Sequence, residues 1–205
     1  MKTIKLSVLL ALSVLFVASS YAQVRIGPSV GFNYSTLVEK DVDNDFIMGL
    51  RAGITLDLGI AKFFSIVPEV NFSQMGYKCV YKDAGQTEIA RLNYIQVPLN
   101  LVFKIKLDTN TRFLLFTGAY GAYAIGGNIK IKIDGGGTEK SKAPFGTNQG
   151  QINPLDIGLN LGLGLQVKKL YSKFQYNMGI NSLSNNKEYA MLNGAISLSL
   201  GFFIK

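Results

Sequence analysis

The chain has 205 residues, enough for one domain of ordinary size, and a formal net charge of +8 at pH 7. It contains no histidine and one cysteine, Cys79, which removes the commonest general base, the commonest transition-metal ligand and any internal disulfide. The basic residues are spread along the chain and do not interleave with aromatic residues, so nucleic acid is not expected as a partner.

Residues 1–22 have the layout of a secretory signal peptide. Two lysines precede an apolar run from Leu6 to Val17, and the Ser-Tyr-Ala sequence at 20–22 is a small-x-Ala cleavage site. The apolar run is shorter than the roughly 20 residues of a membrane-spanning helix, so a retained anchor helix is the weaker alternative. We therefore expect a signal peptide followed by a single exported domain, residues 23–205.

Beyond residue 22 the sequence alternates between apolar and polar residues with a period of two, in long runs separated by turn-like segments. In the last run the even-numbered residues from Ile196 to Ile204 are apolar, whereas Ser197, Ser199 and Gly201 stand between them. A helix would scatter these two sets around its axis, but a strand places them on opposite faces. Eight such strands are predicted in chain order, at residues 25–35, 46–59, 62–81, 88–107, 112–133, 156–167, 173–181 and 190–204.

The run at 112–133 leaves its phase open, because both of its faces carry large apolar residues. Phe113 and Leu115 share one face, and Leu114 and Phe116 share the other. A slip or a β-bulge near Gly126-Gly127 would explain a change of face along this run.

The connections between the predicted strands alternate in length. Residues 59–62, 107–112 and 168–170 are short turns, whereas the longer, polar connections are residues 36–45, 82–87, 128–151 and 182–188. Transmembrane barrels have short periplasmic turns and longer outer loops, and an even number of strands puts both termini on the periplasmic side. We therefore expect periplasmic termini and a mobile outer loop at 128–151.

Alternation alone fits two kinds of barrel, because a soluble lipocalin-type barrel is apolar inside and a membrane barrel is apolar outside. Several runs exceed the roughly 9 to 11 residues that a tilted strand needs to cross a bilayer. The polar faces are rich in Asn, Gln, Gly and Ser, which suits a narrow hydrated interior better than a solvated surface. The sequence thus favours an all-β fold: a single closed, up-and-down, antiparallel transmembrane β-barrel of about eight strands, surrounded by outer-membrane lipid. The soluble barrel is the alternative.

Charged residues occur singly on the predicted polar faces, where an unpaired charge would be costly. They are Arg51, Asp57, Glu69, Lys104 and Lys173. Because a meander places consecutive strands side by side, Arg51, Glu69 and Lys104 are predicted to form a charge network in the lumen, with Glu69 between the two cations. Such a network would obstruct the lumen. The alternative is that Arg51 lies at a mouth of the barrel and is solvated.

We predict no catalytic, cofactor-binding or metal-binding residues, and hence no enzyme. The run Asp41, Asp43, Asp45 resembles the start of a calcium loop, but Phe46 and Ala52 stand where such a loop has Gly and Glu. A solvated acidic loop is the preferred interpretation. Without histidine, and without an evident pair of acids, the sequence offers no general acid–base site.

Four lysines surround a glycine run in the longest predicted loop, at positions 130, 132, 140 and 142. A solvated loop face is the preferred interpretation. Attraction to anionic lipid headgroups is the functional alternative.

Six segments of the chain resemble the PorT-like outer-membrane β-barrel family. They are VGFNYS (30–35), FSIVPEVNFSQMGYK (64–78), LNYIQVPLNLVFK (92–104), TGAYGAY (117–123), DIGLNLGLGLQV (156–167) and FQYNMGINSLSN (174–185). The resemblance implies an outer-membrane barrel with a structural, interaction or secretion-accessory role and no wide pore, with other envelope or secretion proteins as partners. The chain departs from a common barrel ending, because Ile204 and Lys205 follow the last aromatic residue. A narrow pore or a small-ligand-binding barrel is the alternative function.

Overall fold

The computed structural model describes residues 23–38, 44–81, 84–186 and 190–204, and the signal peptide expected at 1–22 lies outside them. Within these ranges the chain forms ten strands, which are β1 (Gln23–Val38), β2 (Asn44–Asp45), β3 (Ile47–Ala61), β4 (Phe64–Tyr81), β5 (Gln86–Lys106), β6 (Thr111–Ile133), β7 (Thr138–Lys142), β8 (Leu155–Val167), β9 (Leu170–Gly179) and β10 (Leu192–Phe202). No helix in the described ranges is long and apolar enough to cross a membrane.

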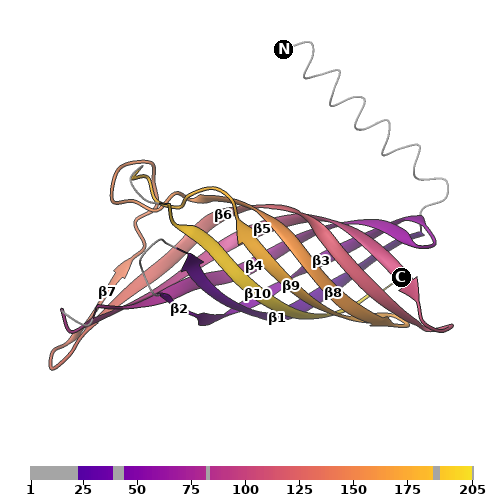
Figure 1. Cartoon of the computed structure of the whole chain (residues 1–205), viewed down its shortest axis with the longest axis horizontal. Coiled ribbons are helices and arrows are strands. Elements are labelled where there is room, and N and C mark those ends of the chain that lie inside the picture. Colours follow the sequence, from indigo (N-terminus) through magenta and orange to yellow (C-terminus); the bar gives the residue numbers. More distant parts are fainter. Residues whose placement is uncertain (1–22, 39–43, 82–83, 187–189, 205) are drawn as a thin grey trace, which may run out of the picture.

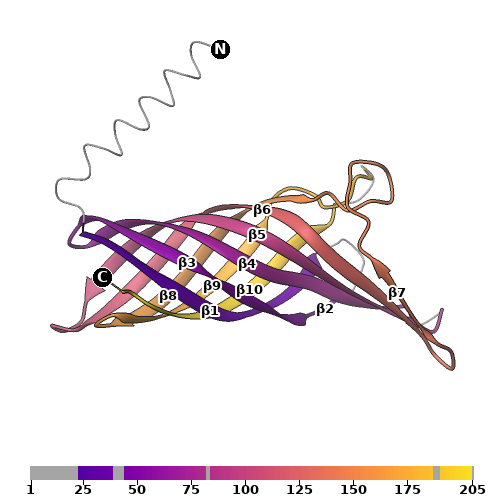
Figure 2. The same cartoon turned by 180° about the vertical axis from the view of Figure 1, so that it is seen from behind.

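Eight of the strands form a closed antiparallel ring in the order β1-β3-β4-β5-β6-β8-β9-β10 (Figures 1 and 2). The ring closes where β1 pairs with β10 from Ser29↔Gly201 to Val38↔Leu192. Closure leaves no free strand edge within the ring, so each strand forms backbone hydrogen bonds with a neighbouring strand on both sides. The predicted fold, a closed up-and-down antiparallel barrel of eight strands, is confirmed.

The three short turns lie at one end of the barrel, here called the turn end, at residues 62–63, 107–110 and 168–169. The described chain also begins and ends there, since Gln23 pairs with Gly59 and the Ile204 amide donates to the Ile26 carbonyl over 2.8 Å. The opposite end, here called the loop end, carries the other connections (Figure 1). Those that follow β1, β7 and β9 are longer, whereas the connection between β4 and β5 has four residues, as many as the turn at 107–110.

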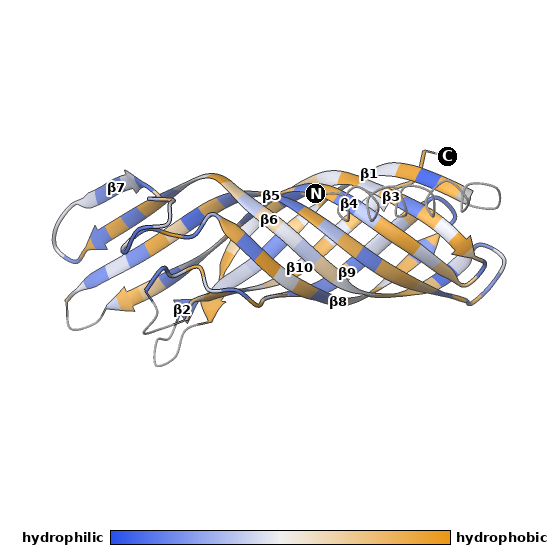
Figure 3. Ribbon diagram, turned by 90° about the horizontal axis from the view of Figure 1, so that it is seen from above, coloured by the Kyte–Doolittle hydropathy of each residue, from blue (hydrophilic) through white to orange (hydrophobic). Residues whose placement is uncertain are grey.

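The side chains of the ring alternate between an outward face that is mainly apolar and an inward face that is mainly polar. Leu161 is 68% exposed and its neighbour Asn160 only 2%, and the same alternation is visible as bands of colour in Figure 3. The buried side chains include many Asn, Gln and Ser residues, whereas the exposed ones are mostly Leu, Ile, Val and Phe. A lipocalin-type soluble barrel would have the opposite arrangement, so that alternative is wrong.

The phase of the fifth predicted strand is settled by a bulge in β6. Asn93 pairs with Gly126 and Tyr94 with Ala124, so Ile125 is the extra residue. Between the turn end and the bulge, the side chains of Leu114 and Phe116 are buried in the interior of the barrel. The sequence left this open because both faces of the strand are apolar.

The expectation of a single loop at 128–151 is wrong. Its first part continues β6 to Ile133 and pairs with β7 from Asn128↔Lys142 to Lys132↔Thr138, forming a hairpin (Figure 2). The Lys-Ile alternation is itself a strand pattern. The turn at 134–137 contains Gly135 at a φ of 74°, a conformation that favours glycine.

The strands of the ring differ greatly in length. β9 and β10 have 10 and 11 residues, which is about what a tilted strand needs to cross a bilayer. β4, β5 and β6 have 18, 21 and 23 residues and run past the others at the loop end (Figure 2). One side of the barrel wall is therefore much taller than the other.

Close packing of the interior gives a testable prediction at Gly158. A Cβ atom added there would overlap the Tyr120 ring and the Met178 carbonyl, whereas one added at Gly121 would meet no atom within 4 Å. We expect Gly158→Ala to lower the free energy of unfolding by roughly 1 to 3 kcal/mol through overpacking. Gly121→Ala, the control, should change it by less than about 0.5 kcal/mol. Urea titration of the refolded barrel in detergent measures both, and equal effects would contradict the packing described here.

Candidate functional site

The candidate site is the lumen, where charged side chains from five strands form two clusters. The first cluster lies near the turn end and is centred on Asp57 of β3. The Nζ atom of Lys104 donates to both carboxylate oxygens of Asp57 over 2.9 and 2.8 Å, and Arg25 pairs with the same carboxylate. The Arg25 guanidinium also lies 4.4 Å from the centre of the Phe203 ring. Two cations thus share one acid.

The second cluster lies deeper in the barrel and is centred on Glu69 of β4. Lys173 pairs with its Oε1, and an Arg51 nitrogen lies 3.6 Å from its Oε2. Asn100 and Asn71 donate to the two oxygens over 3.1 and 3.2 Å. Glu69, Arg51 and Lys173 are each at most 3% exposed, so all three charges are held away from solvent.

The structure divides the residues that the sequence grouped together. Glu69 and Arg51 lie in one cluster, but Lys104 pairs with Asp57 in the other. Arg51 is buried, so the alternative of a solvated Arg51 at a mouth is wrong. Lys173 reaches Glu69 from β9 on another part of the wall, a contact that neighbouring-strand reasoning could not find.

Two further lumen residues were missed by the sequence analysis. Arg25 lies at the start of the first strand. The only sequence signal for a place in the lumen was its position on the polar face of that strand. Asp156 of β8 is fully buried and accepts hydrogen bonds from Tyr120 (3.2 Å) and Asn193 (2.8 Å). Among the described residues no cation lies within ion-pair distance of Asp156.

Side chains fill the space between and beyond the clusters. A cavity of about 20 Å³ lies between the two clusters, between Asp57 and Glu69, which is room for about one water molecule. Towards the turn end, the Tyr171 and Phe203 rings stack with their centres 4.7 Å apart. Towards the loop end, Tyr94 and Tyr120 are buried with Met75 in an apolar cluster.

Two connections at the loop end pack on each other across the chain. The Asn185 side chain donates to the carbonyls of Gly146 and Gln151 over 2.8 and 2.9 Å. The Asn153 amide donates to the Leu183 carbonyl over 2.8 Å, and Leu183 is only 2% exposed. These contacts tie residues 143–154 to residues 180–186 and bury part of both.

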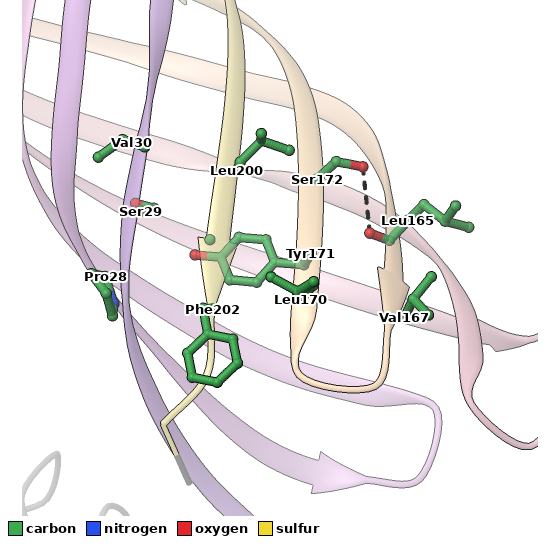
Figure 4. Close-up of a pocket in the computed structure, with 11 residues that line it drawn as sticks. Pro28, Ser29, Val30, Leu165, Val167, Leu170, Tyr171, Ser172, Leu200 and Phe202 are labelled. Atoms are coloured by element: carbon green, nitrogen blue, oxygen red, sulfur yellow. Dashed lines mark hydrogen bonds between the residues drawn. The ribbon is translucent and has the colours of Figure 1, made fainter.

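An apolar groove lies outside the lumen, on the wall near the turn end (Figure 4). It measures about 520 Å³ between β1, β10, β9 and β8, and its lining includes Pro28, Leu165, Leu170, Leu200 and Phe202. A binding pocket for a polar small molecule needs a few convergent polar groups. This groove faces the lipid side of the wall and is lined mainly by aliphatic side chains, so it belongs to the membrane surface.

Candidate metal ligands do not gather within the described ranges, where no group of three or more Asp, Glu or Cys side chains is placed to hold an ion. Of the three aspartates in the acidic run, Asp41 and Asp43 lie outside the described residues. Asp45 forms an exposed ion pair with Lys78 over 2.8 Å.

Comparison with known proteins identifies the class to which this barrel belongs. A family model described as the outer membrane protein beta-barrel domain matches residues 18–185, most of the chain. The chain belongs to this family, and its place is the outer membrane. No curated protein matches the sequence significantly.

Several solved structures resemble the fold at low sequence identity. Neisserial surface protein A is 10% identical, with 86% of this chain and 96% of that chain covered and a TM-score of 0.46. Ail, the attachment invasion locus protein of Yersinia pestis, is 14% identical, with 87% and 98% covered and a TM-score of 0.42. The N-terminal β-barrel domain of Pseudomonas aeruginosa OprF is 11% identical, with 85% and 97% covered and a TM-score of 0.33.

The deeper cluster predicts different effects for two buried acids. Glu69→Gln leaves Arg51 and Lys173 buried without a counter-ion, and we expect it to lower the free energy of unfolding by roughly 3 to 5 kcal/mol. Asp156→Asn, the matched control, removes a charge that contacts only neutral donors and should change stability by less than about 1 kcal/mol. Urea titration in detergent, supported by heat-modifiable migration on gels, measures both. If the control proves as damaging as Glu69→Gln, the ion pairs described here do not determine the difference.

Proposed function

We propose that this outer-membrane barrel is a non-conducting, non-enzymatic scaffold that acts by interaction, as a structural or secretion-accessory protein. The observation that carries this proposal is the filled lumen. An eight-stranded barrel has an interior that side chains can just fill. Here the Asp57 and Glu69 clusters occupy it at two levels. With no room left for a wide aqueous path, the surfaces available for function are the loops and the outer wall.

The proposal includes an orientation, with both termini and the short turns in the periplasm and the longer connections outside the cell. Residues 1–22 would then be the signal peptide that directs export, leaving 23–205 as the barrel. The support is the general asymmetry of transmembrane barrels and the signal-like sequence of the first residues.

A finer assignment, to the PorT-like group, forms part of the same proposal. Its support is the resemblance of the strand sequences, such as residues 64–78 and 92–104, to that group. An accessory to secretion would bind other envelope proteins, and the joined connections at 143–154 and 180–186 offer an ordered surface for such a partner.

A second candidate function is a barrel that binds a small anion. It is favoured by an open recess of about 790 Å³ at the turn end, whose lining includes the cations Arg25, Lys62, Lys104, Lys106 and Arg112. Converging cations in a concave site concentrate anions. Calorimetric titration with inorganic phosphate and short dicarboxylates tests this candidate. Failure to bind either leaves the scaffold as the better account.

The scaffold proposal predicts that the barrel does not conduct ions. The purified barrel reconstituted in planar bilayers should show no stable conductance in molar KCl, because the Glu69 cluster and its neighbours block the lumen. Positive controls are a known porin in the same bilayer and a variant with Phe116 and Tyr120 both replaced by Gly, which empties part of the interior. Regular steps of current from the unaltered protein would support the narrow pore instead.

The proposed orientation predicts that the tip of the β6–β7 hairpin is accessible on intact cells. A short epitope inserted at Gly136, in the exposed turn, should bind antibody without permeabilisation. The same epitope placed in the turn at Asp108–Asn110 should bind antibody only after the outer membrane is broken. The reverse pattern would show that the barrel is inserted the other way.

A further inference from the structure

On the tall side of the barrel wall, the outward side chains change from mainly apolar to mainly polar beyond one row of paired residues. In the row Phe72, Ile95, Tyr123 on β4, β5 and β6, the side chains face outward and are 37, 38 and 58% exposed. Two positions further towards the loop end, at the bulge, Gln74 pairs with Asn93 and Asn93 with Gly126. The continuous apolar band therefore ends at this row on the tall side. The three strands continue beyond it, where their outward apolar residues are the bulged Ile125 and the separated Val80 and Ile89.

Beyond the border, the outward face of the sheet is strongly basic. Lys78, Ile89, Lys130 and Lys140 are paired in one row across β4, β5, β6 and β7. Residues in register share a face of the sheet, so their side chains project on the same side. The adjacent rows add Arg91, Lys142 and Lys132. The basic face is defined by these six residues: Lys78, Arg91, Lys130, Lys132, Lys140 and Lys142.

The acids of these strands lie on the opposite face. Glu88 pairs with Ile131, and Ile131 pairs with Glu139. This row is offset by one residue from the lysine row, so its side chains project from the other face of the sheet. The Glu88 carboxylate is already engaged there, because the Tyr77 hydroxyl donates to it over 2.6 Å. The period-two sequence has thus sorted positive charge outward and negative charge to the other side.

The lysines of the β6–β7 hairpin form no ion pair with an acid in the described part of the chain. Lys78 is paired with Asp45, but among the described residues no acid lies within ion-pair distance of the four hairpin lysines. Lys130 stands directly opposite Lys140. Like charges directly across a strand pair are destabilising, and an anion held between them would offset this repulsion.

We propose that the basic face binds the phosphate groups of phosphorylated glycolipid in the outer leaflet of the outer membrane. The inference rests on the orientation given under the proposed function. The occupant is argued from position: the basic face continues the lipid-facing side of the wall and begins two rows beyond its apolar band, after the uncharged row Gln74, Asn93, Gly126. A glycolipid can lay acyl chains against Phe72 and Ile95 while its phosphates reach Lys78 and Arg91 and the hairpin lysines. A soluble polyanion would use the charges but not the apolar wall below them.

The test compares two double variants of equal charge change. One is Lys130→Gln with Lys140→Gln on the basic face, and the control is Lys168→Gln with Lys169→Gln at the turn end, outside the recess of the second candidate function. The protein, refolded in zwitterionic micelles, is titrated with purified lipopolysaccharide and with the same glycolipid after enzymatic removal of its phosphates. Binding is followed by fluorescence anisotropy at two salt concentrations.

The unaltered barrel should bind the phosphorylated glycolipid, with an affinity that falls as salt rises. The basic-face variant should bind at least about tenfold more weakly, since each lysine near an anionic surface contributes about fivefold. The turn-end control should stay within about twofold of the unaltered barrel. Equal loss in both variants, equal binding of the dephosphorylated glycolipid, or stronger binding of a soluble sulfated polysaccharide than of glycolipid would each overturn the proposal.

Two further measurements keep the test decisive. Heat-modifiable migration on gels shows whether each variant has folded, and a variant with Lys130 and Lys140 both replaced by Arg should retain binding, because it keeps the charge. Binding in micelles does not depend on orientation. A failure to bind therefore counts against the glycolipid site, whereas a reversed epitope pattern at Gly136 counts against the proposed orientation.

Discussion

In the hydrocarbon core of a membrane, an unpaired backbone N–H or C=O has no water to bond, and each such group costs several kcal/mol. The pairing of β1 with β10 satisfies this constraint, because it converts a sheet with two open edges into a ring. Other features follow from the closure. Once the ring is closed, side chains alternate strictly between lipid and lumen, and a polar residue on the inner face must find its partners across a narrow space.

That narrow space explains the arrangement of the interior charges. Glu69 forms ion pairs with two cations from different parts of the wall. Asp57 also forms ion pairs with two cations, nearer the turn end. Each acid is surrounded by amide or ammonium donors, as a buried carboxylate requires. The same groups that make these charges tolerable also fill the barrel. The interior is thus stabilised and blocked by one set of contacts, which is why a non-conducting role is the function that the geometry supports best.

In the tall wall formed by β4, β5 and β6, the same period of two places different types of residue on the outward face at different heights. On the turn-end side of the bulge at Ile125 the outward positions are mainly apolar. Beyond the bulge they are mainly polar or basic, with Val80 and Ile89 as apolar exceptions, although the alternation continues through β7. In lipid the outward face must exclude charge, whereas at the headgroup level cations are favoured near anionic phosphates. The change of residue type along the wall therefore marks where the hydrocarbon ends on that side.

The sequence alone predicted the alternating strands and their number, about eight, and favoured polar faces directed to the lumen, because a period of two is a local property that every strand repeats. It also determined that Arg51, Asp57, Glu69, Lys104 and Lys173 lie on the inner faces. Only the tertiary structure decided which of them pair. Lys173 meets Glu69, and Lys104 meets Asp57, because curvature and stagger bring distant strands together at particular heights, and neither is encoded in the spacing of one strand. The hairpin of β6 and β7 was hidden for a related reason: its glycine-rich turn looks like a loop until the partner strand is placed beside it.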